Sequence, residues 1–166
     1  MTAADEPDTL ADALRRLGDV PPHRVLRTPR PGTATEADQR RTEHAELVDG
    51  TLVHKTVALW KGVAEFVIGG RFFPVVRTDR RGAVTLGTGP YRVAAGIIRL
   101  PDVAFIRWDR LLTAAGDIPD VAPVAPDLVV EIPTADNPPA ELARKYREFF
   151  AAGTRLIWEL DLETRT

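Results

Sequence analysis

The sequence predicts a single α/β domain that contains both antiparallel and parallel strands. In "ELVDGTLV" (46–53), Asp-Gly separates two short apolar runs, which is the signal of a two-residue β-hairpin. Near the C-terminus, an apolar run (127–132), a helical segment (137–153) and a second apolar run (155–161) follow one another, which predicts a right-handed parallel crossover. With 166 residues, 44% of them hydrophobic, the chain can bury one substantial core.

The first elements divide the chain into an arm and a main domain. Residues 1–34 are predicted to consist of a short helix followed by a proline-rich arm. The helix is predicted from the helical spacing of the leucines in 10–17. Residues 35–166 are predicted to form the main domain, whose first helix begins after Thr35 as N-cap and ends near His44.

The middle of the chain predicts one more helix and several strands. Residues 56–70 have an apolar stripe at helical spacing and end at a glycine pair. The stripe consists of Val57, Trp60, Val63, Ala64 and Val67. Segments 72–78, 83–87 and 96–108 are rich in β-branched and aromatic residues, so they are predicted strands. Segment 87–96 is predicted to be a turn, since its glycines lack the strand-to-helix context of a phosphate loop.

Composition excludes several classes of protein. The net charge of -2 argues against a basic nucleic-acid tail, although residues 71–110 contain eight arginines against three acids and form a cationic middle. The absence of cysteine excludes disulfides and thiolate metal sites, and the absence of serine excludes a serine nucleophile. No apolar run approaches the roughly 18 residues of a membrane span, so we expect a soluble cytoplasmic protein with no membrane partner.

Two "PD" pairs precede apolar strands and raise the question of a carboxylate site. Asp127 and Glu131 share one strand, and a rise of about 3.3 Å per residue separates them by roughly 13 Å, too far to share one ion. Asp102 lies on another strand and can sit beside Glu131 if the two strands are neighbours, which would give a two-carboxylate site of the kind Mg²⁺ accepts. Acids at strand ends are also commonly solvated, but an unpaired Glu131 in a buried strand would cost several kcal/mol, on the order of 2–7.

Lys145 is one of only three lysines among 22 basic residues. A helical wheel places it at the edge of an apolar face, where its ammonium group can either reach inward or snorkel to water. That face consists of Leu142, Tyr146, Phe149 and Phe150. Together, Asp102, Glu131 and Lys145 suggest a metal ion held by two carboxylates beside a cation, which is minimal equipment for hydrolysing a phosphodiester.

The order and spacing of several fragments resemble the Uma2 (Uma-two) family, the restriction endonuclease domain of the PD-(D/E)XK nuclease superfamily. The fragments include "ELVDGTLV", "IIRLPDVAFIRWDRL", "APDLVVEI" and "NPPAELARKYREFFAAGTRLIWELDLETRT". The resemblance implies a restriction-endonuclease-like mixed β-sheet flanked by helices and Mg²⁺-dependent cleavage of DNA. It matches Asp102 and Glu131 to the metal-binding acids and Lys145 to the catalytic lysine. It matches Glu46 to a further acid, either a ligand or a hairpin residue paired with an arginine, and the Ile132 carbonyl is a third ligand candidate.

The chain also departs from the family pattern, and the departures define the alternatives. Pro133 stands where the superfamily usually has its lysine, and "HKTVALW" replaces acidic and small residues after the hairpin. The family normally continues past the position of Thr166, so we expect the sheet to be incomplete at its C-terminal edge. The leading hypothesis is an endonuclease that uses Mg²⁺, with Mn²⁺ as a substitute, acts on DNA and can form a homodimer. The alternatives are a catalytically inactive nuclease-fold binding module for protein or nucleic acid and a metal-dependent hydrolase of another phosphate ester.

Overall fold

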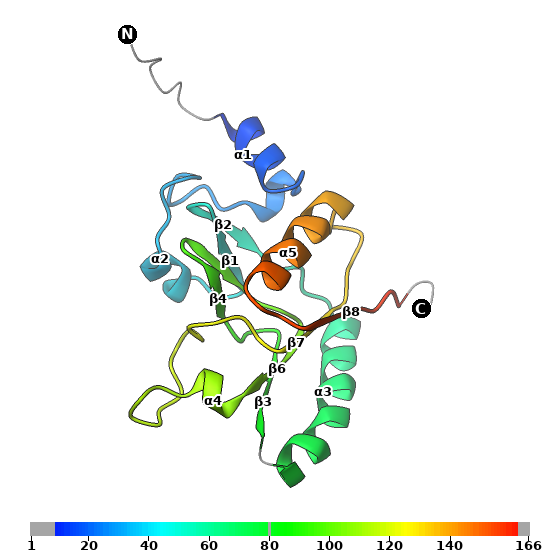
Figure 1. Cartoon of the computed structure of the whole chain (residues 1–166). Coiled ribbons are helices and arrows are strands. Elements are labelled where there is room, and N and C mark those ends of the chain that lie inside the picture. The colour runs from blue at the N-terminus through cyan, green and yellow to red at the C-terminus, as the bar shows by residue number, and fades with distance from the viewer. Residues whose placement is uncertain (1–8, 80, 163–166) are drawn as a thin grey trace.

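The computed structural model describes residues 9–79 and 81–162, along which helices and strands are interspersed (Figure 1). The elements are α1 (Leu10–Arg16), a 3-10 turn (Pro22–Arg24), α2 (Glu36–Arg41), β1 (Ala45–Val48), β2 (Thr51–His54), α3 (Leu59–Asp79), β3 (Gly82–Leu86), β4 (Tyr91–Ala94), β5 (Ile97–Arg99), β6 (Val103–Arg107), α4 (Trp108–Leu111), β7 (Leu128–Glu131), α5 (Pro139–Ala151) and β8 (Leu156–Glu159).

The strands form two four-stranded sheets, in the orders β2-β1-β5-β4 and β3-β6-β7-β8. Every pair in the first sheet is antiparallel, whereas the second sheet is mixed, because β7 and β8 run parallel around the crossover helix α5. The predicted α/β class with a mixed sheet is therefore confirmed. The chain passes from one sheet to the other between β5 and β6, so Asp102 lies at the junction of the two sheets.

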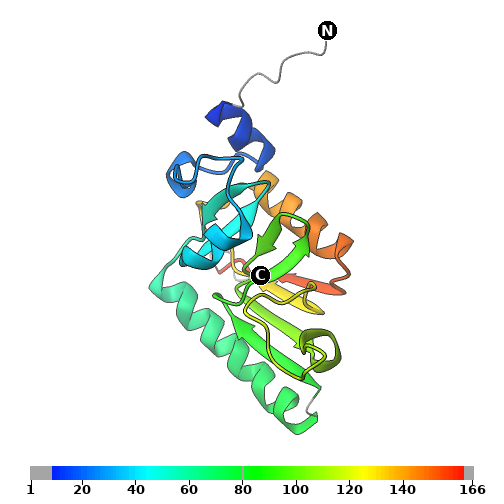
Figure 2. The ribbon, with the colours of Figure 1, turned by 90° about the vertical axis from the view of Figure 1, so that its left-hand side faces the viewer.

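Helices α3 and α5 cover opposite faces of the second sheet (Figures 1 and 2). Val129 packs with Phe149 of α5, whereas its neighbour Val130 packs with Ile68 and Phe72 of α3. This division follows from the alternation of side chains along a strand. At the N-terminal side, Leu17 follows α1 and packs in a cluster separate from those of Val129 and Val130. The division of the chain at residue 34 stays a prediction.

Two turn assignments made from the sequence are confirmed. Asp49 and Gly50 both have positive φ angles, 47° and 67°, as a two-residue hairpin turn requires, and they join β1 to β2. A Cβ at Gly50 would also lie 2.6 Å from the Gly32 carbonyl oxygen. Helix α5 begins at Pro139 and is followed by Gly153 at a φ of 96°.

The predicted strand at 72–78 is wrong, because α3 continues through it to Asp79. The glycine pair does not end the helix. A Cβ at Gly69 would lie 2.7 Å from Leu86 Cδ2, so this glycine allows the helix to pass close to β3. Pro74 is accommodated inside the helix at an exposed position.

Three smaller assignments also differ from the structure. The predicted turn 87–96 contains β4, whose Tyr91 is buried and hydrogen-bonded through its hydroxyl to Thr85 Oγ1 at 2.8 Å. The second predicted helix ends at Arg41, before His44. On α5, Phe150 is exposed, since the buried side chains lie on the neighbouring stripe.

The apolar face predicted for residues 56–70 is wrong except for Ala64, because its other four members are exposed. The residues of α3 that pack against the sheet include Ala64, Ile68 and Phe72, together with the buried Lys61. The exposed apolar residues of this region are Val57, Leu59, Trp60, Val63, Phe66, Val67 and Phe73. None of the helices within 9–79 and 81–162 is both long enough and apolar enough to cross a lipid bilayer.

Candidate active site

The two predicted acids lie on neighbouring strands of the mixed sheet. Asp102 immediately precedes β6, and Glu131 is the last residue of β7. These strands pair antiparallel with Val103 opposite Val130, so the register continued by one residue places Asp102 opposite Glu131. The condition for a shared site, that the two strands be neighbours, is therefore met.

Asp102 is fully buried and surrounded by positive charge. Its Oδ2 accepts a hydrogen bond of 2.7 Å from the Ile132 backbone N–H. Lys55 Nζ lies 2.7 Å from Oδ1, and Lys61 Nζ lies 3.0 Å from Oδ2. Burial alone would raise the pKa of Asp102, but the ammonium groups of Lys55 and Lys61 outweigh burial and lower it. Asp102 is therefore held as a carboxylate without any bound metal ion.

Lys145 points inward from α5 and bridges two carboxylates. Its Nζ lies 2.8 Å from Glu131 Oε1 and 3.0 Å from Glu46 Oε1. Burial alone would lower the pKa of Lys145, but Glu131 and Glu46 outweigh burial and raise it. Of the two positions left open by the sequence, this lysine takes the inward one, and its ammonium group does not snorkel to the surface.

Among the acids of this cluster, Glu131 is the one whose negative charge is least stabilised by its surroundings. Burial raises its pKa to about 7, Lys145 opposes that rise, and the nearby carboxylate of Asp102 adds to it. Glu131 Oε1 and Asp102 Oδ1 are both buried, and neither accepts a well-directed hydrogen bond despite the nearby ammonium groups. These two oxygens therefore keep lone pairs that no hydrogen bond uses, although an ammonium group already lies within 2.8 Å of each.

Glu46 has the arginine partner that was one of the two roles considered from the sequence, and its role as a metal ligand stays a prediction. It pairs with Arg99 at 2.7 Å and accepts a 2.9 Å hydrogen bond from the Leu100 N–H, and it also contacts Lys145. Burial would raise the pKa of Glu46, but Lys145 and Arg99 hold it well below its usual range. Arg99 extends the network to Glu148 of α5, at 2.6 Å, so ion pairs join the first sheet to this helix.

Sequence reasoning missed Lys55 and Lys61. Lys55 directly follows β2 and also donates to the Gly87 carbonyl at 3.2 Å, while Lys61 lies near the start of α3. All three lysines of the chain therefore meet at this one cluster of acids. The scarcity of lysine that singled out Lys145 was an equally good signal for the other two.

The donor types fit a hard divalent cation, but the site is already neutralised. Asp102 and Glu131 offer the carboxylate oxygens that Mg²⁺ prefers, and two of those oxygens lack well-directed hydrogen bonds. Within the part of the chain that the structure describes, no three Asp, Glu, His or Cys residues converge closely enough to hold a metal ion. The cavity beside the lysines has an accessible volume of about 10 Å³, enough for about one water molecule.

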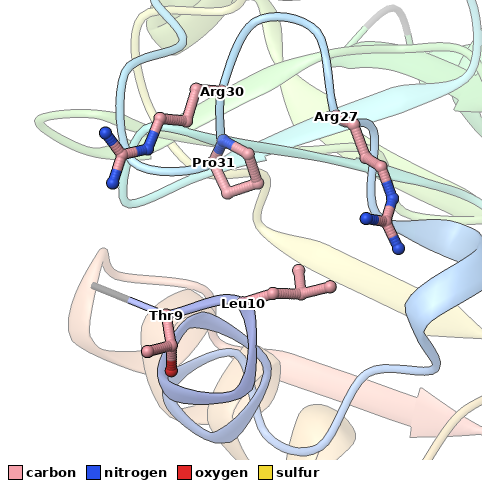
Figure 3. A pocket seen from close by; sticks show the side chains of 5 residues that line it. All are labelled: Thr9, Leu10, Arg27, Arg30 and Pro31. Atoms are coloured by element: carbon pink, nitrogen blue, oxygen red, sulfur yellow. The ribbon is translucent and has the colours of Figure 1, made fainter. Parts of the chain in front are cut away.

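Other sequence candidates and pockets lie elsewhere. Asp127 of the second "PD" accepts from the Arg107 N–H at 3.0 Å and pairs with Arg110 at 2.8 Å, which is a structural role. A larger pocket of about 190 Å³ lies between α1 and the proline-rich arm, where Arg27, Arg30 and Pro31 lie across from Thr9 and Leu10 (Figure 3). Among the residues that the structure describes, no acid lines that pocket, so they do not offer the carboxylate chemistry of the junction between the sheets.

Comparison with known proteins agrees with this geometry. The model of the Uma2 family, described as "Putative restriction endonuclease", matches residues 33–166. The chain belongs to the Uma2 family. Membership in the Uma2 family supports a nuclease. The matched residues include the hairpin, both metal-binding candidates and Lys145.

A solved structure similar to this Uma2 chain is a putative nuclease belonging to DUF820 from Anabaena variabilis, with 21% sequence identity and a TM-score of 0.61. The alignment covers 70% of this chain and 65% of that protein, so the chain spans about two thirds of its length. At this identity the likeness supports the fold. No curated protein matches the chain.

Proposed function

We propose that this Uma2 chain is an endonuclease that hydrolyses phosphodiester bonds of DNA with the help of Mg²⁺. The observation that supports the proposal best is the meeting of Asp102, Glu131 and Lys145 from three separate elements at one buried point. Membership in a family described as a restriction endonuclease makes DNA the substrate of first choice. A homodimer stays a prediction, which sedimentation of the purified chain would test.

In this proposal, each residue of the cluster has a separate task. Asp102 and Glu131 would hold Mg²⁺, or Mn²⁺ in its place, with Glu46 and the Ile132 carbonyl as further ligand candidates. A bound ion of this kind polarises a phosphoryl oxygen and lowers the pKa of a coordinated water. Lys145 would place its positive charge beside the scissile phosphate and stabilise the negative charge that develops there. Arg99 pairs with Glu46 and with Glu148 of α5, and so orients Glu46 beside Lys145.

Plasmid cleavage tests the proposal. We expect nicking or linearisation with Mg²⁺ or Mn²⁺ and none with excess chelator. Asp102→Asn and Glu131→Gln should each abolish cleavage, because both remove a ligand charge while preserving side-chain size. Asp127→Asn is the matched control, since Asp127 belongs to the other "PD" pair and contacts Arg110 instead of the cluster. Equal loss of activity in all three variants would reject the assigned acids.

A second candidate is a non-catalytic binding module on the same scaffold. The specific observation in its favour is that lysines already neutralise the acids, at 2.7–3.0 Å from Asp102. This candidate predicts DNA or protein binding with no cleavage in Mg²⁺, Mn²⁺ or chelator. Fluorescence anisotropy with labelled duplex DNA, read beside the cleavage assay, separates the two functions.

A further inference from the structure

We propose that Lys55 and Lys61 are built-in competitors of the divalent ion, so that a metal binds at Asp102 only by displacing their ammonium groups. The inference rests on the proposed function in one respect, that Asp102 is a metal ligand. It assigns a role to two lysines that lie outside the acid–acid–lysine set of Asp102, Glu131 and Lys145.

The first support is the occupancy of the Asp102 oxygens. Lys55 contacts Oδ1 and Lys61 contacts Oδ2, and both lysine side chains are at least nine-tenths buried. Ammonium groups at 2.7–3.0 Å from a carboxylate stand in the space that a divalent ion and its remaining ligands would need. An ion that approaches Asp102 therefore meets both steric exclusion and like charge.

The second support is the lack of room beside the cluster. The cavity of about 10 Å³ is lined by Lys55, Lys61 and Lys145 and by the acids Glu46 and Glu131. Mg²⁺ prefers six oxygen ligands and usually keeps several waters, which this volume cannot hold. Entry of the ion consequently requires at least one lysine side chain to move.

The third support is a nearby acceptor for a displaced lysine. Glu65 lies one helical turn after Lys61 on α3 and is about half buried. Burial leaves the pKa of Glu65 raised, although the electrostatic influence of Lys55 and Lys61 opposes that rise, so this side chain already senses both ammonium groups. It also lines a second cavity, of about 150 Å³, together with Lys55. The lysines can thus leave Asp102 without losing every carboxylate partner.

Calorimetric titration of the metal-free full chain with MnCl₂ tests the inference. Lys55→Met and Lys61→Met each keep the aliphatic stem but remove one competing charge, so Mn²⁺ affinity should rise by about tenfold or more. Each variant retains the other lysine beside Asp102, which protects the fold against a fully unpaired buried charge. Lys61→Arg retains the charge and should leave the affinity near that of the parent.

Arg24→Met is the matched control. Arg24 is a buried cation that lines the same cavity, yet it pairs with Glu141 at 2.7 Å instead of with the Asp102–Glu131 pair. Its removal should change Mn²⁺ affinity by less than about twofold, even if it lowers the melting temperature. A rise as large as that of the lysine variants would attribute the effect to general loosening and would overturn the inference.

The outcomes separate this inference from the proposed function. Unchanged or weaker Mn²⁺ binding in both Lys55→Met and Lys61→Met, or no binding by the parent and both variants, overturns the competition. If the parent cleaves DNA while these affinities do not rise, the proposed function stands and the inference fails. If the affinities rise but no variant cleaves DNA with any metal, the inference stands and the nuclease assignment fails.

Discussion

The substitution Lys145→Met addresses the charge balance of the site most directly. Lys145 lies between Glu131 and Glu46, so the change leaves two buried carboxylates with one fewer cation. Glu46 keeps Arg99 and the Leu100 N–H, and the loss therefore falls mainly on Glu131. Methionine preserves the unbranched shape of the lysine stem, which restricts the perturbation to the missing charge.

The size of the effect follows from burial. Removing one partner of a buried ion pair costs about 3–5 kcal/mol, and the remaining partners of Glu46 favour the lower end, about 3 kcal/mol. For a domain of this length, 1 kcal/mol lowers the melting temperature by about 2–4 °C, so a fall of about 6–12 °C is expected.

The same substitution should change the pH dependence of stability. Without Lys145, the pKa of Glu131 in the folded protein should rise above its present value of about 7, further from its usual value of 4.5. A folded-state pKa that is raised means that the folded protein binds the proton more tightly than the unfolded chain. Its contribution to stability is fully present below 4.5 and is lost as pH rises through the folded value. The difference in melting temperature between parent and variant should hence be smaller at pH 5 than at pH 8.

Thermal melts followed by circular dichroism in excess chelator measure both effects. Arg147→Met serves as the control, because Arg147 lies on the same helix but is exposed, and the control should melt within about 2 °C of the parent. The reasoning is refuted if Lys145→Met also melts that close to the parent at pH 8, or if acidification widens the difference.

Two further substitutions test the support of the site. Arg99→Met should lower the free energy of unfolding by about 3 kcal/mol, because Arg99 links Glu46 and Glu148 at a buried position. Chemical denaturation would measure this loss, and a loss below about 1 kcal/mol would contradict the expectation. Gly18→Ala should lower stability by at least about 1 kcal/mol, because φ is 91° there and the added Cβ would lie 2.5 Å from the Glu141 backbone nitrogen; an unchanged melting temperature would show that the α1–α5 contact is not tight.

The acids and Lys145 could be placed from the sequence because local rules determine them. The rise along a strand separates Asp127 from Glu131, and the wheel of α5 places Lys145 at the edge of the apolar face, within reach of the core. Pairing between β6 and β7 then suffices to bring Asp102 to Glu131.

Lys55 and Lys61 could not be placed in the same way, because Lys55 lies in the segment between β2 and α3 and the position of Lys61 depends on where α3 packs. That helix has apolar residues on nearly every side, so its periodicity does not indicate which face meets the sheet. The β-branched and aromatic residues of 72–78 favour a strand locally, but contacts such as that of Phe72 with Trp158 retain them in the helix. Long-range packing decides both points, and no local pattern reports it.

Because every lysine is buried, the lysines of the native protein should be protected from amine-reactive reagents. The side chains of Lys55, Lys61 and Lys145 are only 9%, 5% and 7% exposed, and each ammonium group is engaged with a carboxylate. An acylating reagent requires the neutral, accessible amine, so these residues should react slowly in the native protein and quickly once the chain unfolds. Mass spectrometry after brief acylation would then count how many of these amines are uncovered, and would report opening of the site residue by residue without any engineered probe.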